Sequence, residues 1–256
     1  MMADANIVGM EDADRAPLGV VRVRAPNPSP LTLDGTNSYV VENWVIDPGP
    51  PLDEHFFAIE RSAWPKGIEG IVLTHGHFDH DEGAPRLAER AGGVPVVRPV
   101  GDEEVGPFTA IATPGHSSDH VCLMWGRVCF TGDTVLGEGS VFVGAGDGSM
   151  AQYLESLRRL RQLDIETICP GHGPFVWDPR RRIDENLEHR LDRELRILDA
   201  LGEGASSLDE ILDRAWSDTD ISAHPLLREA ARLTLEAHLI KLRDEGRLPP
   251  GAPQPS

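Results

Sequence analysis

Side chains that could hold a metal are concentrated in the segment Thr74-His75-Gly76-His77-Phe78-Asp79-His80. This segment directly follows the apolar run Ile71–Leu73 and contains three of the chain's ten histidines. Imidazole nitrogens and carboxylate oxygens suit Zn²⁺ and other first-row divalent ions. Because side chains alternate along an extended segment, His75 and His77 point to one side, and we expect Asp79 and His80 to face a second position. The pattern predicts a metal site at the end of a strand.

Three later segments each end a strand-like run with one more ligand-type residue. They are Thr113-Pro114-Gly115-His116, Thr131-Gly132-Asp133 and Pro170-Gly171-His172-Gly173. Their glycines permit a close approach of the backbone. One Pro-Gly-His motif alone would indicate only a turn. In this order behind the first cluster, however, His116, Asp133 and His172 complete a set of seven candidate ligands.

In order and approximate spacing, these motifs resemble those of the metallo-β-lactamase superfamily, over roughly residues 18–176. The resemblance implies an αββα sandwich, an α/β (α+β) fold with the metals at one edge of two packed sheets. It implies one metal held by His75, His77 and His116, a second held by Asp79, His80 and His172, and Asp133 as the bridge. True β-lactamases of this type place a Cys or lack a bridging carboxylate at the position of Asp133, so we do not expect antibiotic hydrolysis.

A pair of divalent metals bridged by a carboxylate points to hydrolysis. Such ions lower the pKa of a bridging water toward neutrality, supply hydroxide and polarise the oxygen of the group under attack. We expect Zn²⁺, with Mn²⁺ or Fe²⁺ as alternatives, because nitrogen and oxygen ligands accept several of these ions. The resemblance gives Asp79 the role of orienting the hydroxide and taking its proton. Asp79 and Asp133 are therefore the expected catalytic carboxylates.

The elements that must position these residues are short strands and interleaved helices. β-Branched runs between turn residues predict strands over Val20–Val23, Ser38–Val41, Trp44–Ile46, Ile71–Thr74, Val94–Val97, Val121–Met124, Val128–Thr131 and Ser140–Val143. Apolar periodicity predicts helices over Leu52–Ser62, Ala84–Ala91 and Ala151–Leu163. After Pro174 the strand signals end, and helices are expected over Asp184–Leu201, Leu208–Ala215 and Pro225–Gly246.

This change of texture predicts a catalytic domain over residues 1–176, a winged-helix-like domain over 177–248 and a disordered, Pro/Gly-rich tail over 249–256. The winged helix is implied by a resemblance to the β-lactamase-like protein 2 group. The segments that carry it are Thr36–Tyr39, His116–His120, Gly132–Gly139, Leu187–Arg190 and Ala237–Leu242. Animal members of that group are endoribonucleases. The resemblance therefore implies a phosphodiesterase acting on single-stranded RNA as the leading function.

Two other classes of function stay open. A thioesterase or lactonase similar to the hydroxyacylglutathione hydrolases would use the same two metals on the acyl carbon of a small ester or thioester. The glutathione-binding region of those enzymes is not recognisable here. A non-enzymatic regulator that binds nucleic acid is disfavoured, because intact metal ligands would then have no task.

Four residues are candidates for contacts with the substrate. Asn37 and His120 flank motifs at the metal-bearing edge, although either could equally hold a loop by hydrogen bonds. His189 and Arg190 fall on the first helix of the second domain, where packing or an ion pair between the domains is the preferred interpretation.

The net charge of −18 repels polyanions and argues against duplex DNA as a partner. Arginines at 158–161, 180–182 and 190–196 could still follow an RNA backbone, although a solvated, ion-paired face is the simpler interpretation. Three cysteines are too few for a disulfide framework, and no apolar run suggests a secretory signal or a membrane span. We expect a cytoplasmic protein, and the oligomeric state stays open.

Overall fold

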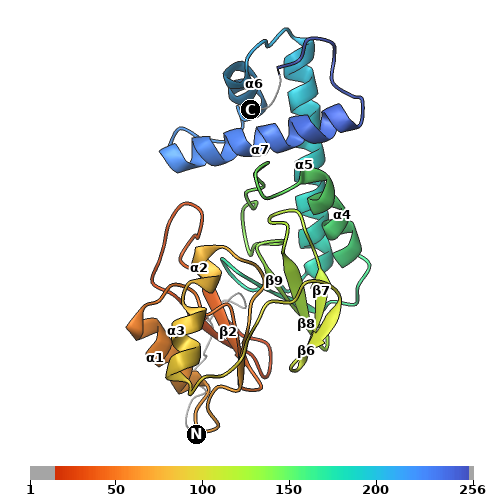
Figure 1. Cartoon of the computed structure of the whole chain (residues 1–256). Coiled ribbons are helices and arrows are strands. Elements are labelled where there is room, and N and C mark those ends of the chain that lie inside the picture. Colours follow the sequence, from red (N-terminus) through yellow and green to blue (C-terminus); the bar gives the residue numbers. More distant parts are fainter. Residues whose placement is uncertain (1–14, 254–256) are drawn as a thin grey trace, which may run out of the picture.

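Two β-sheets form the centre of the computed structural model, which describes residues 15–253 (Figure 1). The first sheet has the order β1-β2-β3-β4-β5. Its strands are β1 (Val21–Arg24), β2 (Asn37–Val41), β3 (Trp44–Ile46), β4 (Gly70–Val72) and β5 (Val96–Val97). Neighbouring strands from β1 to β3 are antiparallel, whereas β3, β4 and β5 are parallel. The predicted metal-binding motif that begins at Thr74 therefore follows an internal, fully buried strand.

The second sheet has the order β10-β9-β8-β7-β6. Its strands are β6 (Glu103–Val105), β7 (Phe108–Ala112), β8 (Val121–Trp125), β9 (Val128–Gly132) and β10 (Thr167–Pro170). The predicted strands Val121–Met124 and Val128–Thr131 pair as the antiparallel hairpin of β8 and β9, and β10 lies parallel to β9. Asp133 and His172 follow the ends of these two neighbouring parallel strands, which brings them to one edge.

Helices cover the outer face of each sheet. The first sheet is covered by α1 (Asp53–Ser62) and α3 (Ala84–Arg90), and the second by α4 (Met150–Leu160) and the first part of α5, while the short α2 (Phe78–Asp81) lies at the edge of the first sheet (Figure 1). The inner faces meet in an apolar cluster where Tyr39 from one sheet lies 5.1 Å from Phe130 of the other, ring centre to ring centre. The two packed sheets with helices on their outer faces confirm the expected αββα sandwich. Cys122, Cys129 and Cys169 are free thiols buried in this core.

One predicted strand, Ser140–Val143, is absent from the sheets. Its alternating pattern fits a strand, but its backbone carbonyls have other partners. The Val141 carbonyl accepts a hydrogen bond from Arg190, and the Phe142 carbonyl accepts one from the His116 ring. Contacts with the site and the C-terminal helices replace the ladder that a strand would make.

Three helices follow the sandwich: α5 (Pro179–Gly202), α6 (Leu208–Ala215) and α7 (Pro225–Asp244). The first begins earlier than expected because Asp178 caps it, accepting a hydrogen bond from the Arg181 N–H at 3.1 Å. Ile183 in its first half packs with α4, whereas Ile197 in its second half packs with α6 and α7 (Figure 1). Packing therefore changes inside α5, not at the expected boundary between residues 176 and 177.

The C-terminal segment does not contain the expected wing. Residues 177–253, all of which the structure describes, form helices and turns without a strand, so the winged-helix prediction is not confirmed. Residues 249–253 make a turn in which the Ala252 N–H donates to the Pro249 carbonyl at 3.2 Å, and Ala252 packs on the helical cluster. This differs from the expected disorder from 249 onward, while 254–256 lie outside the described residues. Among the described helices, none has the length and apolar character needed to cross a bilayer.

Candidate metal centre

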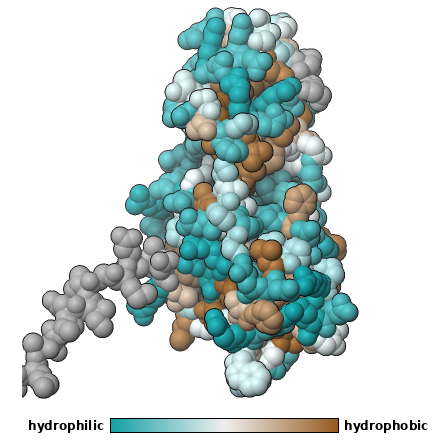
Figure 2. All heavy atoms as spheres, turned by 90° about the vertical axis from the view of Figure 1, so that its left-hand side faces the viewer, coloured by the Kyte–Doolittle hydropathy of each residue, from teal (hydrophilic) through white to brown (hydrophobic). Residues whose placement is uncertain are grey.

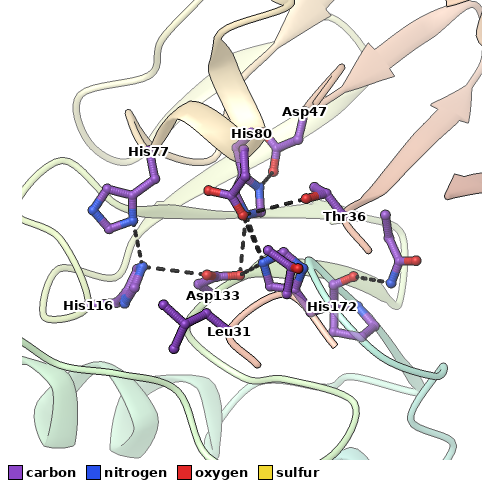
Figure 3. A network of polar contacts seen from close by, with 12 residues as sticks. Leu31, Thr36, Asp47, His77, His80, His116, Asp133 and His172 are labelled. Carbon is purple, nitrogen blue, oxygen red and sulfur yellow. Dashed lines mark hydrogen bonds and ion pairs between the residues drawn. The ribbon is translucent and has the colours of Figure 1, made fainter. Parts of the chain in front are cut away.

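Three histidines meet at one edge of the sandwich, as Figure 3 shows for two of them. The His75 Nε2 atom lies 3.2 Å from the Nδ1 atom of His77. The same Nδ1 atom lies 2.9 Å from the Nε2 atom of His116. The ring nitrogens converge on one point although their residues come from the loop after β4 and the loop between β7 and β8.

A second group consists of Asp79, His80 and His172. The Nε2 atoms of the two histidines lie 3.3 Å apart. The Asp79 Oδ2 atom lies 3.2 Å from the Nε2 atom of His172 and 3.6 Å from that of His80. These donors again face a common point.

Asp133 spans the two groups (Figure 3). Its Oδ1 atom lies 3.4 Å from the Nε2 atoms of both His80 and His172. Its Oδ2 atom lies 3.5 Å from the Nε2 atom of His116. One carboxylate therefore offers one oxygen to each group, as a bridge must.

The spacing of the donor atoms fits two divalent cations. Ligands about 2.1 Å from a common ion lie roughly 3.0–3.4 Å from one another in tetrahedral or octahedral geometry. The distances between the ring nitrogens and carboxylate oxygens lie in or close to this range. Neutral imidazoles and carboxylates are also the forms in which these groups bind first-row metals.

Hydrogen bonds on the far side of the rings orient them. The Nδ1 atoms of His80, His116 and His172 lie 2.8, 2.7 and 3.3 Å from the Asp47 carboxylate, the Phe142 carbonyl and the Gly35 carbonyl, respectively. Each of these partners accepts the Nδ1 proton. A proton on Nδ1 leaves the lone pair of Nε2 directed at the centre.

Asp47 is the residue that sequence reasoning missed. Its Oδ2 atom accepts from His80 and, at 2.6 Å, from the Thr74 hydroxyl, which lies 3.0 Å from the Nδ1 atom of His75. This buried carboxylate thus supports histidines of both groups. Its backbone is left-handed, with φ of 47°, a conformation that costs free energy in a residue with a side chain. The available signal was its position directly after the strand Trp44–Ile46.

The electrostatics of the centre favour ionised carboxylates. Burial acts to raise the pKa of Asp133, but the neighbouring His172 and His80 outweigh it and hold the pKa well below its usual range. Burial lowers the pKa of His75 well below its usual value. For His172, burial acts to lower the pKa, yet Asp133 and Asp79 raise it to about 9. A proton therefore competes with a metal for this last nitrogen at neutral pH.

Two of the four predicted substrate contacts lie beneath the centre. The Asn37 amide donates to the carbonyls of Pro170 and Gly173, at 3.0 and 2.9 Å, and so holds the loop of His172. The His120 Nε2 atom accepts the backbone N–H of Asp133 at 3.1 Å. Both side chains are buried and neither borders the cavity.

The other two, His189 and Arg190, do border the cavity, which has a volume of about 730 Å³ and opens from the metal centre toward α5 and α7. Its wall includes Asp79, Asp133 and His172 at one end. Its apolar lining consists of Leu136 and Phe142 from the loops of the sandwich and of Trp216, Ile221, Leu227 and Ala231 from the C-terminal segment, while α5 adds the charged residues Arg182, Glu185, Arg190 and Arg193. Figure 2 shows hydrophobic residues at the level where the helices meet the sandwich.

The fold and the centre define a class of protein: metal-dependent hydrolases built on a two-sheet sandwich. A model of the metallo-β-lactamase superfamily matches residues 31–109 and 94–172, which together span more than half of the chain. The chain belongs to this superfamily.

Similar curated proteins carry two kinds of name. Homologues of β-lactamase-like protein 2 are 31% identical in Caenorhabditis elegans, over 77% of this chain and 76% of that protein, and 30% identical in Drosophila melanogaster, over 90% and 89%. An atrochrysone carboxyl ACP thioesterase from Aspergillus fumigatus is 31% identical, over 71% of this chain and 64% of the relative.

Solved structures share the fold. A metallo-β-lactamase family protein from Thermus thermophilus superposes with a TM-score of 0.67 at 22% identity, over 89% of this chain and 94% of its own. The protein TTHA1623, solved in a di-iron-bound form, has a TM-score of 0.52 at 27% identity, over 66% and 97%. The first likeness extends beyond the sandwich into the C-terminal helices, since the sandwich ends before residue 177.

Proposed function

We propose that this hydrolase cleaves a small carboxylic ester or thioester whose acyl group occupies the cavity between the sandwich and the C-terminal helices. The observation that carries the proposal is the apolar wall that begins at the metal centre. Leu136 and Phe142 lie near its start and Trp216, Ile221 and Leu227 lie on the helical side. Burial of an organic chain against such walls provides binding free energy.

Several of the arginines that could have followed an RNA backbone are paired with carboxylates. Arg159 pairs with Asp102, Arg161 with Asp184, Arg181 with Glu185, and Arg196 with Asp192. These pairs neutralise the charge that a phosphate backbone would need. This supports the thioesterase or lactonase alternative over the leading sequence expectation.

The seven side chains of the centre would hold two divalent ions, which when bound lower the pKa of water and polarise the scissile carbonyl. Asp79 borders the cavity, and its Oδ2 atom accepts a long hydrogen bond of 3.5 Å from the Thr36 hydroxyl. Burial acts to raise the pKa of Asp79, but His172 and His80 lower it, so the carboxylate is ionised. It can orient a water molecule and accept its proton.

Single-stranded RNA is the second candidate substrate. The similarity to β-lactamase-like protein 2 homologues extends over most of the chain and favours it. An RNA substrate would have to enter between exposed side chains at the mouth, which include Leu31 and Phe78. Base stacking on Phe78 would be its main support.

A substrate panel separates the two candidates. Zn²⁺- and Mn²⁺-loaded protein is assayed with acyl thioesters, carboxylic esters and single-stranded RNA. Asp79→Ala should abolish turnover, whereas Glu82→Ala, which removes an acid outside the ligand set from the same segment, should not. Metal-dependent RNA cleavage without thioester or ester turnover would reject the proposal.

A further inference from the structure

Three arginines border the cavity, and one of them differs from the others. Arg182 pairs with Glu185 at 3.4 Å, and Arg193 pairs with Asp218 at 2.9 Å. Arg190 is only 3% exposed, and within residues 15–253 no carboxylate forms an ion pair with it. Burial lowers the pKa of its guanidinium, and the neighbouring Tyr153 offsets only part of this effect.

The contacts of Arg190 leave part of its guanidinium free. Its Nη2 atom donates to the Val141 carbonyl, and its charged group lies 5.4 Å from the centre of the Tyr153 ring. Its Nε atom is buried and has no hydrogen-bond partner among the described residues. A buried donor without an acceptor destabilises the fold. A ligand that supplies an acceptor to Arg190 would therefore recover free energy on binding.

His189 supplies a second unused donor. Its Nε2 atom lies 3.5 Å from the Nη2 atom of Arg193. A guanidinium only donates, so this ring nitrogen must accept and the proton must be on Nδ1. The Nδ1 atom is buried and has no acceptor among the described residues. His189 and Arg190 therefore both border the cavity, and each has a buried donor atom without a partner among the described residues.

Arg190 lies within a small molecule's length of the metal centre. The Val141 carbonyl that accepts from Arg190 precedes Phe142, whose carbonyl accepts from the metal-site residue His116. On the other side, the Tyr153 hydroxyl under Arg190 donates at 3.0 Å to the carbonyl of Thr134, the neighbour of Asp133. Arg190 is thus connected to the centre through the Val141–Phe142 backbone on one side and through the Tyr153 side chain on the other.

We propose that Arg190, assisted by His189, binds a carboxylate at the end of the acyl chain remote from the scissile bond. The inference rests on the proposed ester or thioester hydrolysis and specifies its substrates as acids. A guanidinium can donate two parallel hydrogen bonds to the oxygens of one carboxylate. The apolar wall between the anion site and the centre contacts the methylenes that link the two groups.

Paired substrates test the assignment. Glutaryl and pentanoyl thioesters of N-acetylcysteamine differ only in their terminal group, carboxylate against methyl. The wild type should prefer the glutaryl thioester by about 10- to 100-fold in kcat/KM, the range of a charge-assisted hydrogen bond. Arg190→Met should bring this ratio near unity, while Arg180→Met, which removes an exposed arginine outside the cavity, should leave it. An unchanged ratio in Arg190→Met would overturn the proposal.

A binding experiment keeps the anion site testable if no thioester is hydrolysed. The melting temperature of zinc-loaded protein is compared with glutarate, pentanoate and inorganic phosphate. Glutarate should stabilise the wild type more than pentanoate, and Arg190→Met should remove the difference. If the wild type hydrolyses no thioester but is still stabilised more by glutarate than by pentanoate, the proposed ester or thioester hydrolysis is rejected and the anion site is supported. Stronger stabilisation by phosphate than by glutarate would assign the site to a phosphorylated substrate instead.

Ligand-free stability separates recognition from packing. Because Arg190 is a buried cation without an anion, Arg190→Met should retain or raise the melting temperature of the unliganded protein. Loss of stability together with an equal loss of activity on both thioesters would identify Arg190 as a structural residue and contradict the proposal. His189→Phe gives a second variant, which should lower the preference for glutaryl without abolishing it.

Discussion

At the scale of single residues, the centre depends on side chains that do not face the metals. Asp47 contacts His80 directly and His75 through the Thr74 hydroxyl. Its strained backbone and its burial indicate that the surrounding fold holds it in place for this task.

Asp47→Asn is expected to weaken metal binding. Both carboxylate oxygens accept hydrogen bonds, Oδ1 from the Thr74 N–H and Oδ2 from the Thr74 hydroxyl and His80, whereas an amide replaces one of them by an NH₂ group that cannot accept. Loss of such a supporting contact lowers metal affinity by about 10- to 100-fold. Competition with a chelator measures it, and Asp53→Asn, in an exposed pair with Arg86, serves as the control. Equal affinities in the two variants would contradict the role of Asp47.

Gly171→Ala should disturb the bridge. A Cβ atom at this position would lie 2.6 Å from the Asp133 Oδ1 atom and 2.7 Å from the His80 ring. His80 belongs to the second group and Asp133 spans the two groups, so an added methyl group would displace one or both of these side chains. We expect less than two metals per chain and strongly reduced turnover, with Gly146→Ala, where no atom lies nearby, as the control. Elemental analysis after dialysis checks the stoichiometry, and two retained metals would refute the expectation.

At the scale of elements, α5 joins the catalytic layer to the C-terminal helices. Its first half covers the second sheet and its second half builds the helical core. In its second half, the buried Glu194 pairs with Lys241 of α7 at 2.7 Å and with Arg247 at 2.9 Å. This ion-pair cluster fixes the helices that form the far wall of the cavity.

Acid should weaken the packing of α5 on α7. Burial acts to raise the pKa of Glu194, but His238 and Lys241 lower it from 4.5 to about 2. Because the folded-state pKa is depressed, its stabilisation is complete above pH 4.5 and is lost as the pH falls toward 2.

Glu194→Gln should therefore flatten the acid dependence of stability in that interval. At neutral pH it should cost about 3 kcal/mol, because the mostly buried Lys241 loses its buried partner and keeps only its ion pair with the exposed Glu245 at 2.9 Å. Urea denaturation of the metal-free protein across this pH range measures both effects. Glu203→Gln, in an exposed pair with Arg214, is the matched control. A parallel pH dependence of wild type and Glu194→Gln would contradict this account.

At the scale of the whole molecule, the seven candidate ligands come from segments that span residues 75 to 172 and both sheets. The cavity adds residues from α5 and α7, so the site requires the C-terminal helices as well as the sandwich. Metals in the centre would cross-link the sandwich.

Metal removal should lower the melting temperature. A ligand that binds only the folded state stabilises it by about 4 kcal/mol when present at a thousandfold excess over its Kd. Calorimetry with and without chelator measures the change, and readdition of Zn²⁺ should restore it. A melting temperature that does not respond to metal would show that the centre does not hold one in the folded state.

Most elements around the centre could be predicted from local patterns. The strands before Asp47 and Thr74 and the hairpin of β8 and β9 follow from β-branched runs between turn residues. The edge strand β6 could not be predicted in this way. Its sequence, Glu103-Glu104-Val105, is mostly acidic and exposed, and it becomes a strand only by pairing with β7. Ser140–Val143 has the pattern of a strand, but its carbonyls bind His116 and Arg190, which are distant in the chain.

The sequence by itself predicted the seven candidate donors, because ligand types and their order along the chain can be read without the fold. It also determined the sandwich, through a resemblance carried by those motifs. Only the tertiary structure decided which residues support the ligands and which face a substrate: Asn37 and His120 lie beneath the centre, whereas His189 and Arg190 border the cavity. The reason is physical. Burial and hydrogen-bond partners depend on segments brought together by folding, so the unpaired cation at Arg190 is visible only after α5 is placed against Val141 and Tyr153.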